Sequence, residues 1–301
     1  MRMLARLQQS IVFFLLAASS GWAGYFLIHG SVAWAPGGLI LIVIVYLGAI
    51  GFEFCKLRRS YSAQDVNRPT LAQLLSAWWS EVLVAPRVFL WRQPFRSNAI
   101  SDSLSAALPG SRGVVFVHGF FCNRGLWNPW MEGLLDAHVP FVAVTLEPVF
   151  GSIDEYAPRI EQAVRRLETA TGRAPVIVAY SMGGLAVRAW LQRPGGASRI
   201  HHVVTIATPH RGTAMARHAY TRNSQQMRIG SVWLKALSAG EAPKSHLAFT
   251  CFWSRCDNIV FPTDSATLSG ADNRQLEVTP HVRMVYHREV FAEVMRLVGM
   301  R

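Results

Sequence analysis

Short apolar runs recur along the carboxyl-terminal two thirds of the chain, separated by stretches of mixed polarity. The runs are continuous rather than alternating with polar residues, which is typical of strands buried on both faces of a parallel sheet. They predict six strands, at residues 113–119, 141–147, 176–181, 200–208, 247–254 and 274–279.

Helical patterns lie between these runs and after the last of them. In residues 152–172, apolar residues such as Ile160 and Leu167 recur at the spacing of one helix face, and the last predicted helix covers Arg288–Leu297. Strands that alternate with helices predict an α/β domain over residues 111–301, with a mostly parallel, doubly wound sheet and helices on both faces.

Two longer apolar runs precede this domain, at residues 11–28 and 36–54, with a glycine- and proline-rich turn between them. From Ile11 to Phe52 the chain has no Asp, Glu, Lys or Arg. Each run approaches the ~20 apolar residues that a membrane-spanning helix needs. The pattern therefore predicts a hairpin of two transmembrane helices within residues 1–59.

The cations that flank the hairpin predict its orientation. Arg2 and Arg6 lie before the first run, Lys56, Arg58 and Arg59 lie after the second, and the turn between the runs has no Lys or Arg. Under the positive-inside rule both ends of the hairpin, and with them the α/β domain, are predicted on the cytoplasmic side. One alternative stays open: the first run with its arginines also fits a cleaved signal peptide, with "GWAG" as the cleavage site, or a single anchor.

Residues 60–110 are predicted to connect the hairpin to the domain, and part of this connector is amphipathic. In "TLAQLLSAWWSEVLVAPRVFL", Pro69 precedes a helical pattern that Pro86 is expected to end. The residues predicted to share one side of this helix are Leu71, Leu74, Leu75, Trp78, Val82 and Leu83. Such a helix either lies on the membrane surface or packs on the globular domain.

The amino-acid composition and charge limit the classes of partner that the chain is expected to bind. Of its 301 residues 51% are hydrophobic, and the formal net charge is +12, carried almost entirely by arginine. The sequence has no nucleic-acid recognition motif, so we expect no nucleic-acid partner, and the basic residues suit either anionic lipid headgroups or a diffusely basic surface. In the cytoplasm we expect the four cysteines to be reduced packing residues; they are Cys55, Cys122, Cys251 and Cys256.

The strongest chemical signal is "VIVAYSMGGLAVR", where an apolar strand changes directly into a helical pattern at Ser181. A sharp strand-to-helix turn of this kind holds a nucleophile in a strained backbone conformation and exposes its hydroxyl group. The neighbouring residues must be small, and Ala179, Gly183 and Gly184 meet that need. We therefore predict that Ser181 is a nucleophile and that these three residues, together with Gly119, support the turn.

A nucleophilic serine needs a base and an acid that orients the base, and both have candidates in the chain order serine, acid, histidine. Asp257 follows the fifth predicted strand, and its rivals Asp264 and Asp272 lie further from the strand end. His281 follows the sixth predicted strand, on a loop before the last helix, and its rival is His287 at the mouth of that helix. We predict Asp257 and His281 for these roles.

The oxyanion of a tetrahedral intermediate needs two backbone N–H donors. Met182, directly after the serine, is predicted to supply one, and Phe120 in the loop "VHGFFCN" the other, with Gly119 allowing the chain to turn tightly. His118 in that loop, and His210 in the loop after the fourth strand, are predicted to be structural.

Four segments, "FVHGFFCN", "AYSMGGLAVR", "TIATPHRGT" and "CDNIVFPTDSATL", together resemble bacterial lipases and esterases of the α/β-hydrolase superfamily, over about residues 115–285. The resemblance implies an α/β-hydrolase fold and hydrolysis of carboxylic esters through an acyl-enzyme, with a lipid or another acyl ester as substrate. It gives Ser181, Asp257 and His281 the triad roles and Phe120 and Met182 the oxyanion hole. It implies neither a metal ion nor an organic cofactor.

The predicted hairpin departs from the secreted members of that superfamily. It places the protein in the bacterial inner membrane, with the hydrolase domain on the cytoplasmic side. Other readings of the same residues are an acyltransferase, a thioesterase, a peptidase or a non-catalytic membrane scaffold. Residues 212–245 form a long insertion, in which Trp233, Leu234 and Leu237 either cap the site and line an acyl pocket or pack on the domain.

Overall fold

The computed structural model describes residues 3–62, 64–104, 110–241 and 248–300. Six parallel strands form one sheet in the order β2-β1-β3-β4-β5-β6. The strands are β1 (Val114–Val117), β2 (Phe141–Ala143), β3 (Val176–Tyr180), β4 (His202–Ile206), β5 (Phe249–Trp253) and β6 (Asp272–Gln275). The α/β fold class is confirmed, but β6 begins two residues before its predicted run and consists of polar, mostly exposed residues at the sheet edge.

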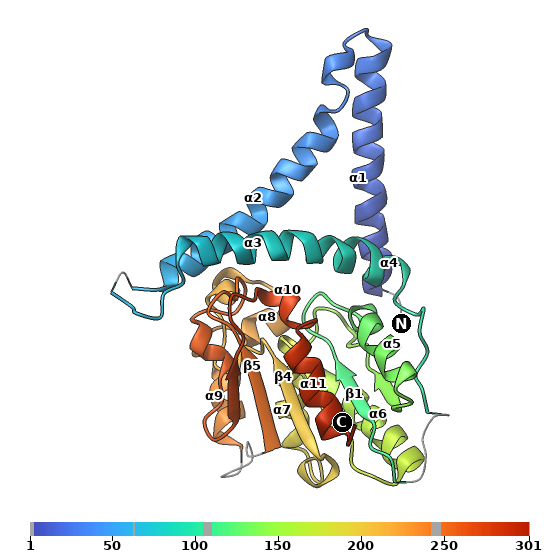
Figure 1. Cartoon of the computed structure of the whole chain (residues 1–301), viewed down its shortest axis with the longest axis vertical. Coiled ribbons are helices and arrows are strands. Elements are labelled where there is room, and N and C mark those ends of the chain that lie inside the picture. Colours follow the sequence, from blue (N-terminus) through green and yellow to red (C-terminus); the bar gives the residue numbers. More distant parts are fainter. Residues whose placement is uncertain (1–2, 63, 105–109, 242–247, 301) are drawn as a thin grey trace.

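Helices cover both faces of this sheet, as Figure 1 shows. Val115 and Val117 of β1 face a core that α6 and α7 complete, whereas Val114 and Phe116 face a second core built with α5 and α11. Successive side chains of β1 therefore point into two different buried layers, which explains why the strand is apolar throughout. The helices of this domain are α5 (Asn128–Asp136), α6 (Ala157–Thr171), α7 (Met182–Leu191), α8 (Arg222–Gln226), α9 (Val232–Ala239), α10 (His281–Met284) and α11 (Arg288–Leu297).

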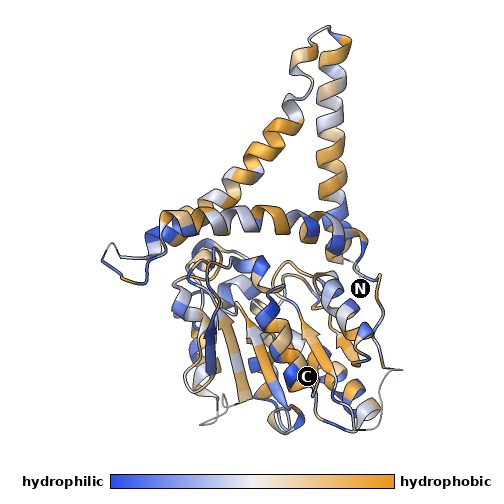
Figure 2. Ribbon diagram, in the orientation of Figure 1, coloured by the Kyte–Doolittle hydropathy of each residue, from blue (hydrophilic) through white to orange (hydrophobic). Residues whose placement is uncertain are grey.

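Two long helices, α1 (Met3–Ile28) and α2 (Gly37–Ser60), rise from the domain as a hairpin. Each is long and apolar enough to cross a membrane, and the most apolar part of each is almost entirely exposed. Figure 2 shows apolar residues along the length of both. α1 begins well before residue 11 and α2 ends after residue 54, so both helices are longer than predicted; Arg2 lies outside the described residues.

The helix α3 (Leu71–Pro86) lies crosswise between the hairpin and the α/β domain (Figure 1). Thr70 caps its amino-terminal end through a capping box with Gln73. Pro86 is the last residue of the α-helix, as predicted, but the helical path continues as a π-helical segment (Arg87–Arg92) that leads into α4 (Gln93–Phe95). Proline has no N–H to donate to the carbonyl oxygen of Val82 one turn earlier, and that oxygen accepts the Tyr46 hydroxyl instead, at 2.8 Å.

The apolar residues of α3 divide between two sides of the helix. Leu74 and Val82 are buried in a small core that α3 shares with α2 and with residues beyond β5. Leu71, Leu75 and Leu83 are more than half exposed. The prediction of one shared side was therefore wrong, because α3 buries only one flank of its apolar surface against the rest of the chain.

Candidate active site

Ser181 is the single residue between the end of β3 and the start of α7. Its backbone has φ 52° and ψ −126°, a conformation that costs a residue with a side chain of the order of 1–3 kcal/mol. The Ser181 N–H donates a hydrogen bond of 2.8 Å to the carbonyl oxygen of Ile206 at the end of β4, which helps to hold this conformation. The strain places the hydroxyl group at the carboxyl edge of the sheet, where sites of doubly wound folds lie.

Small residues surround this turn because neighbouring backbone and side-chain atoms leave no room for larger ones. Ala179 is fully buried within β3. A Cβ atom at Gly183 would lie 2.5 Å from the carbonyl oxygen of Val117, and one at Gly184 would lie 2.2 Å from Oγ1 of Thr208. Both distances are far below van der Waals contact, so the turn depends on two glycines in succession.

Gly119 lies against the turn at Ser181, and it does not have the positive φ of a tight turn. The residue with positive φ in its loop is Phe121, at 53°, and not Gly119. A Cβ atom at Gly119 would lie 2.8 Å from Cβ of Ser181. The glycine is therefore needed for the close approach of the loop to Ser181 rather than for a tight turn.

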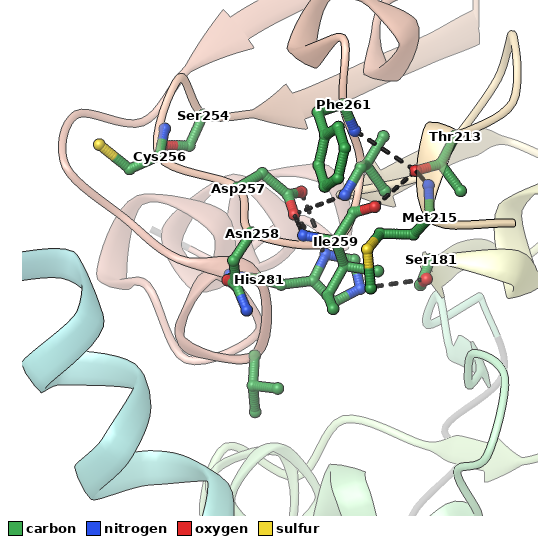
Figure 3. Close-up of polar contacts among 12 residues, drawn as sticks. Ser181, Thr213, Met215, Ser254, Cys256, Asp257, Asn258, Ile259, Phe261 and His281 are labelled. Carbon is green, nitrogen blue, oxygen red and sulfur yellow. Dashed lines mark hydrogen bonds and ion pairs between the residues drawn. The ribbon is translucent and has the colours of Figure 1, made fainter. Parts of the chain in front are cut away.

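The structure brings Ser181, His281 and Asp257 together in one hydrogen-bonded chain (Figure 3). His281 Nε2 lies 3.2 Å from Oγ of Ser181, and His281 Nδ1 lies 2.9 and 3.0 Å from the two carboxylate oxygens of Asp257. Asp257 Oδ1 also accepts hydrogen bonds of 2.9 Å from the N–H groups of Ile259 and Val260. These bonds fix the carboxylate, which in turn fixes the orientation of the imidazole ring.

Two opposing effects act on the pKa of the His281 imidazole. Burial lowers this pKa, whereas the adjacent Asp257 carboxylate raises it, helped by Glu81 and Glu53. The carboxylates prevail, and the pKa of His281 is raised above its ordinary value. A ring held in this way is well suited to accept a proton from the serine.

The rival acid and base candidates lie elsewhere. Asp264 and Asp272 are exposed and form ion pairs with Arg211 and Arg274. His287 caps the amino-terminal end of α11, where its ring accepts a hydrogen bond from the N–H group of Glu289. His281 itself is the first residue of the short helix α10, so the prediction that it lies on a loop was wrong.

Phe120 and Met182, the two predicted oxyanion donors, both lie beside Ser181. Met182 is the first residue of α7, and an amide at that position has no acceptor within the helix. Phe120 follows Gly119 in the loop that lies against Ser181, and it lines the same cavity as the serine. Both residues are therefore placed where a helix terminus and a loop meet at the hydroxyl group.

Two further histidines near the site are engaged in structural contacts. His118 Nδ1 donates to the carbonyl oxygen of Gly119, and His118 Nε2 accepts the N–H of Leu146, each at 2.9 Å. Burial lowers the pKa of His118 to about 4, so the ring stays neutral. His210 is buried, with Nε2 3.1 Å from Oγ1 of Thr205.

A cavity of about 650 Å³ opens beside Ser181 and His281. Part of the long insertion, residues 213–227, contributes to its wall, but Trp233, Leu234 and Leu237 do not. Leu234 and Leu237 are buried in the domain core, and Trp233 Nε1 donates to Oδ2 of Asp154 at 2.8 Å. These three residues therefore pack on the domain; positions 242–245 of the insertion lie outside the described residues.

Residues 114–288, more than half of the chain, match the alpha/beta hydrolase family. The chain belongs to this family. The match covers all six strands of the hydrolase sheet and the loops that carry Ser181, Asp257 and His281.

Solved structures show the same fold. The mature form of the *Bacillus licheniformis* lipase BlEst2 has 18% sequence identity and a TM-score of 0.56, over 64% of this hydrolase and 94% of that chain. *Aspergillus fumigatus* lipase B has 16% identity and a TM-score of 0.55, over 64% of this hydrolase and 53% of that chain. No curated protein matches the sequence.

Sequence reasoning missed three residues that line the cavity beside Ser181. Glu53 of α2 and Glu81 of α3 line the cavity, together with Asn258, which follows Asp257 directly. The signal for the two glutamates is composition: with Asp65 they are the only acidic residues among the first hundred. A glutamate in an otherwise apolar helix needs a partner when it is buried.

The cysteines and the metal-ligating residues add no further chemistry. All four cysteines are free thiols; Cys122, Cys251 and Cys256 are buried as predicted, whereas Cys55 is exposed on α2. Within the ranges that the structure describes, no group of three or more His, Cys, Asp or Glu side chains is arranged to hold a metal ion.

Proposed function

We propose that this hydrolase is a membrane-anchored serine esterase that cleaves carboxylic esters of lipids through an acyl-enzyme. One observation carries the proposal: the His281 imidazole lies between the Ser181 hydroxyl, 3.2 Å from Nε2, and the Asp257 carboxylate, 2.9 Å from Nδ1. This arrangement of groups activates a serine for attack on a carbonyl carbon.

The proposed reaction proceeds in two halves. His281 Nε2 takes the proton of Ser181 as Oγ attacks the ester carbonyl, and Asp257 stabilises the resulting imidazolium. The N–H groups of Phe120 and Met182 stabilise the oxyanion. His281 then gives its proton to the leaving alcohol, and in the second half it deprotonates the water that releases the acid from Ser181.

The cavity supports a substrate with an acyl chain. Its volume of about 650 Å³ is typical of small-molecule sites, and its wall beside the serine includes Phe120, Phe121, Met215 and Met227. Burial of hydrocarbon contributes about 0.8 kcal/mol per CH₂ group, so an apolar wall favours longer acyl chains over shorter ones. BlEst2 and lipase B, which share the fold, are lipases, and this supports the same class of activity here.

The proposed anchor is the hairpin of α1 and α2 in the bacterial inner membrane. The exposed side of α3 supports this location, because Leu71, Leu75, Trp79 and Leu83 recur there every four residues and are each more than half exposed. α3 lies crosswise to α1 (Figure 1), as an interfacial helix does beside spanning helices. The hairpin and α3 would then contact one bilayer together.

Labelling with a fluorophosphonate tests the proposed chemistry. In detergent micelles the full chain is expected to form an adduct that peptide mass spectrometry locates on Ser181. The same sample is expected to hydrolyse p-nitrophenyl esters with a kcat/KM that rises from butyrate to laurate, because the cavity wall is apolar. An adduct on another residue, or none, would contradict the assignment.

Reporter fusions test the proposed orientation. A fusion after Arg301 is expected to give the signal of a cytoplasmic reporter, because the cations lie at the two ends of the hairpin. A fusion in the turn between α1 and α2 is the matched control and is expected to give a periplasmic signal. A periplasmic signal from the carboxyl-terminal fusion would favour the alternative of a signal peptide followed by one anchor.

A further inference from the structure

Glu81 joins the crosswise helix α3 to the segment that carries the proposed catalytic histidine. Its side chain is 3% exposed and accepts hydrogen bonds from the N–H groups of Val282, at 2.9 Å, and Arg283, at 3.3 Å. These are the two residues that follow His281 at the start of α10. N–H groups at a helix start have no acceptor within the helix, so the carboxylate supplies one from α3.

A second carboxylate reaches the same histidine from the membrane hairpin. Glu53 of α2 accepts a hydrogen bond of 2.6 Å from Nδ2 of Asn258. Oδ1 of Asn258 in turn accepts the N–H of His281 at 3.1 Å. The backbone N–H of His281 is therefore linked to α2 through Asn258, and the two residues after it are bound to α3.

The same helical path also contacts the loop on the opposite side of the serine. Gln93 of α4 accepts the N–H of Asn123 through Oε1, at 3.1 Å, and the Asn123 side chain through its carbonyl oxygen, at 3.0 Å. Asn123 lies three residues after Phe120 in the loop that approaches Ser181. Residues 71–95 thus hold both loops between which the proposed reaction takes place.

A buried carboxylate is an expensive way to dock a helix. Burial raises the pKa of Glu81 to about 7, although the hydrogen bond from Val282 acts in the opposite direction. An apolar residue would pack there without losing hydration, but it would leave the N–H groups of Val282 and Arg283 without this acceptor. The carboxylate therefore acts on the segment that carries His281 in addition to docking α3.

We infer that Glu81 is a positioning residue for His281 and that, together with Glu53, it makes turnover depend on the docking of α2 and α3. This inference rests on the proposed serine-esterase function. It assigns to the membrane-proximal helices a part in the site itself, in addition to anchoring.

The pH dependence of turnover gives a readout that a purely structural contact would not change. His281 faces Asp257 after β5, Tyr180 of β3, Glu81 of α3 and Glu53 of α2. Glu81 interacts electrostatically with several titratable groups, which are His281, Asp257, Tyr46 of α2, Tyr180 and Tyr286. Negative charge at Glu81 raises the pKa of His281. Removing it lowers that pKa, so the loss of activity at acid pH moves to lower pH.

Four variants of the full chain in detergent micelles separate charge from shape. Glu81→Gln removes the charge and places an amide donor opposite one of the two N–H groups; Glu81→Asp keeps the charge but shortens the side chain. Glu53→Gln removes the second charge. Glu132→Gln, an exposed residue of α5, is the matched control. The measurements are kcat, KM and the pH profile of kcat/KM with a p-nitrophenyl ester.

Glu81→Gln is expected to lower kcat by roughly ten-fold to a hundred-fold with little change in KM, because a small displacement of the base slows proton transfer. The acid limb of its pH profile, which is the range where kcat/KM falls as the pH is lowered, is expected at lower pH than in the wild type. Glu81→Asp is expected to lower kcat but to keep the wild-type limb, and Glu132→Gln to match the wild type in both.

An active wild type with an unchanged kcat and acid limb in Glu81→Gln would overturn the inference and leave the serine-esterase proposal intact. A wild type that neither reacts with fluorophosphonate nor hydrolyses esters would instead refute the proposed function. If Glu81→Gln does not fold, the pH profile of Glu53→Gln tests the inference instead. An acid limb of kcat/KM at lower pH than in the wild type supports the inference, and an unchanged acid limb overturns it.

Discussion

Replacing His281 by alanine is expected to lower kcat/KM for ester hydrolysis by about 10⁴-fold or more, and Ser181→Ala by a similar factor. The two residues are joined by one hydrogen bond and act in one proton transfer, so removing either abolishes the same step. The double variant is therefore expected to be no slower than either single one. Initial rates with a p-nitrophenyl ester in micelles, at matched concentrations of folded protein, measure these losses.

His287→Ala is the matched control for the histidine. Its ring caps the amino-terminal end of α11 and does not line the cavity, so we expect a loss of at most a few-fold. Loss of this cap is expected to lower the thermal midpoint slightly rather than to change kcat. A dead but folded His287→Ala together with an active His281→Ala would move the proposed base to the start of α11.

Much of the hydrolase fold follows from local patterns in the sequence. Strands buried on both faces are mostly apolar, so β1, β3 and β4 are easily recognised as nearly continuous runs. β6 is different, because it lies at the sheet edge and carries the polar sequence "DNRQ". A strand without an apolar face has no pattern to recognise, and the prediction settled on the apolar residues that follow it.

Contacts between distant helices and the site left weaker signals. A helix prediction finds α3 from its spacing, but the spacing does not reveal that one flank packs on α2 while the other stays exposed. The partner of Glu81 is two backbone N–H groups, and backbone groups are the same for every sequence. Ser181, Asp257 and His281 could be predicted because the proposed chemistry of each depends on residue type.

Replacing either of the two glycines after Ser181, Gly183 or Gly184, is expected to have the second large effect. The new side chains would meet different kinds of atoms at the two positions, and this difference can be tested. A Cβ atom at Gly183 would meet the carbonyl oxygens of Val117 and His118 at 2.5 and 2.6 Å. Backbone at the end of β1 cannot move without disturbing the sheet. Gly183→Ala is therefore expected to destabilise the domain by more than the ~3 kcal/mol typical of severe overpacking.

At Gly184 the obstacle is a side chain. The Oγ1, Cγ2 and Cβ atoms of Thr208 lie 2.2, 2.6 and 2.9 Å from the position of an added Cβ, and all three are absent from glycine. Gly184→Ala is expected to lower the thermal midpoint and the yield of protein that reacts with fluorophosphonate, and Thr208→Gly in the same chain is expected to restore part of both. Added to Gly183→Ala, Thr208→Gly is expected to restore nothing, because backbone causes that clash. Equal rescue of both variants would mean that the turn at Ser181 can shift as a unit. Its strained backbone would then be held less firmly than its contacts with Ile206 and Thr208 indicate.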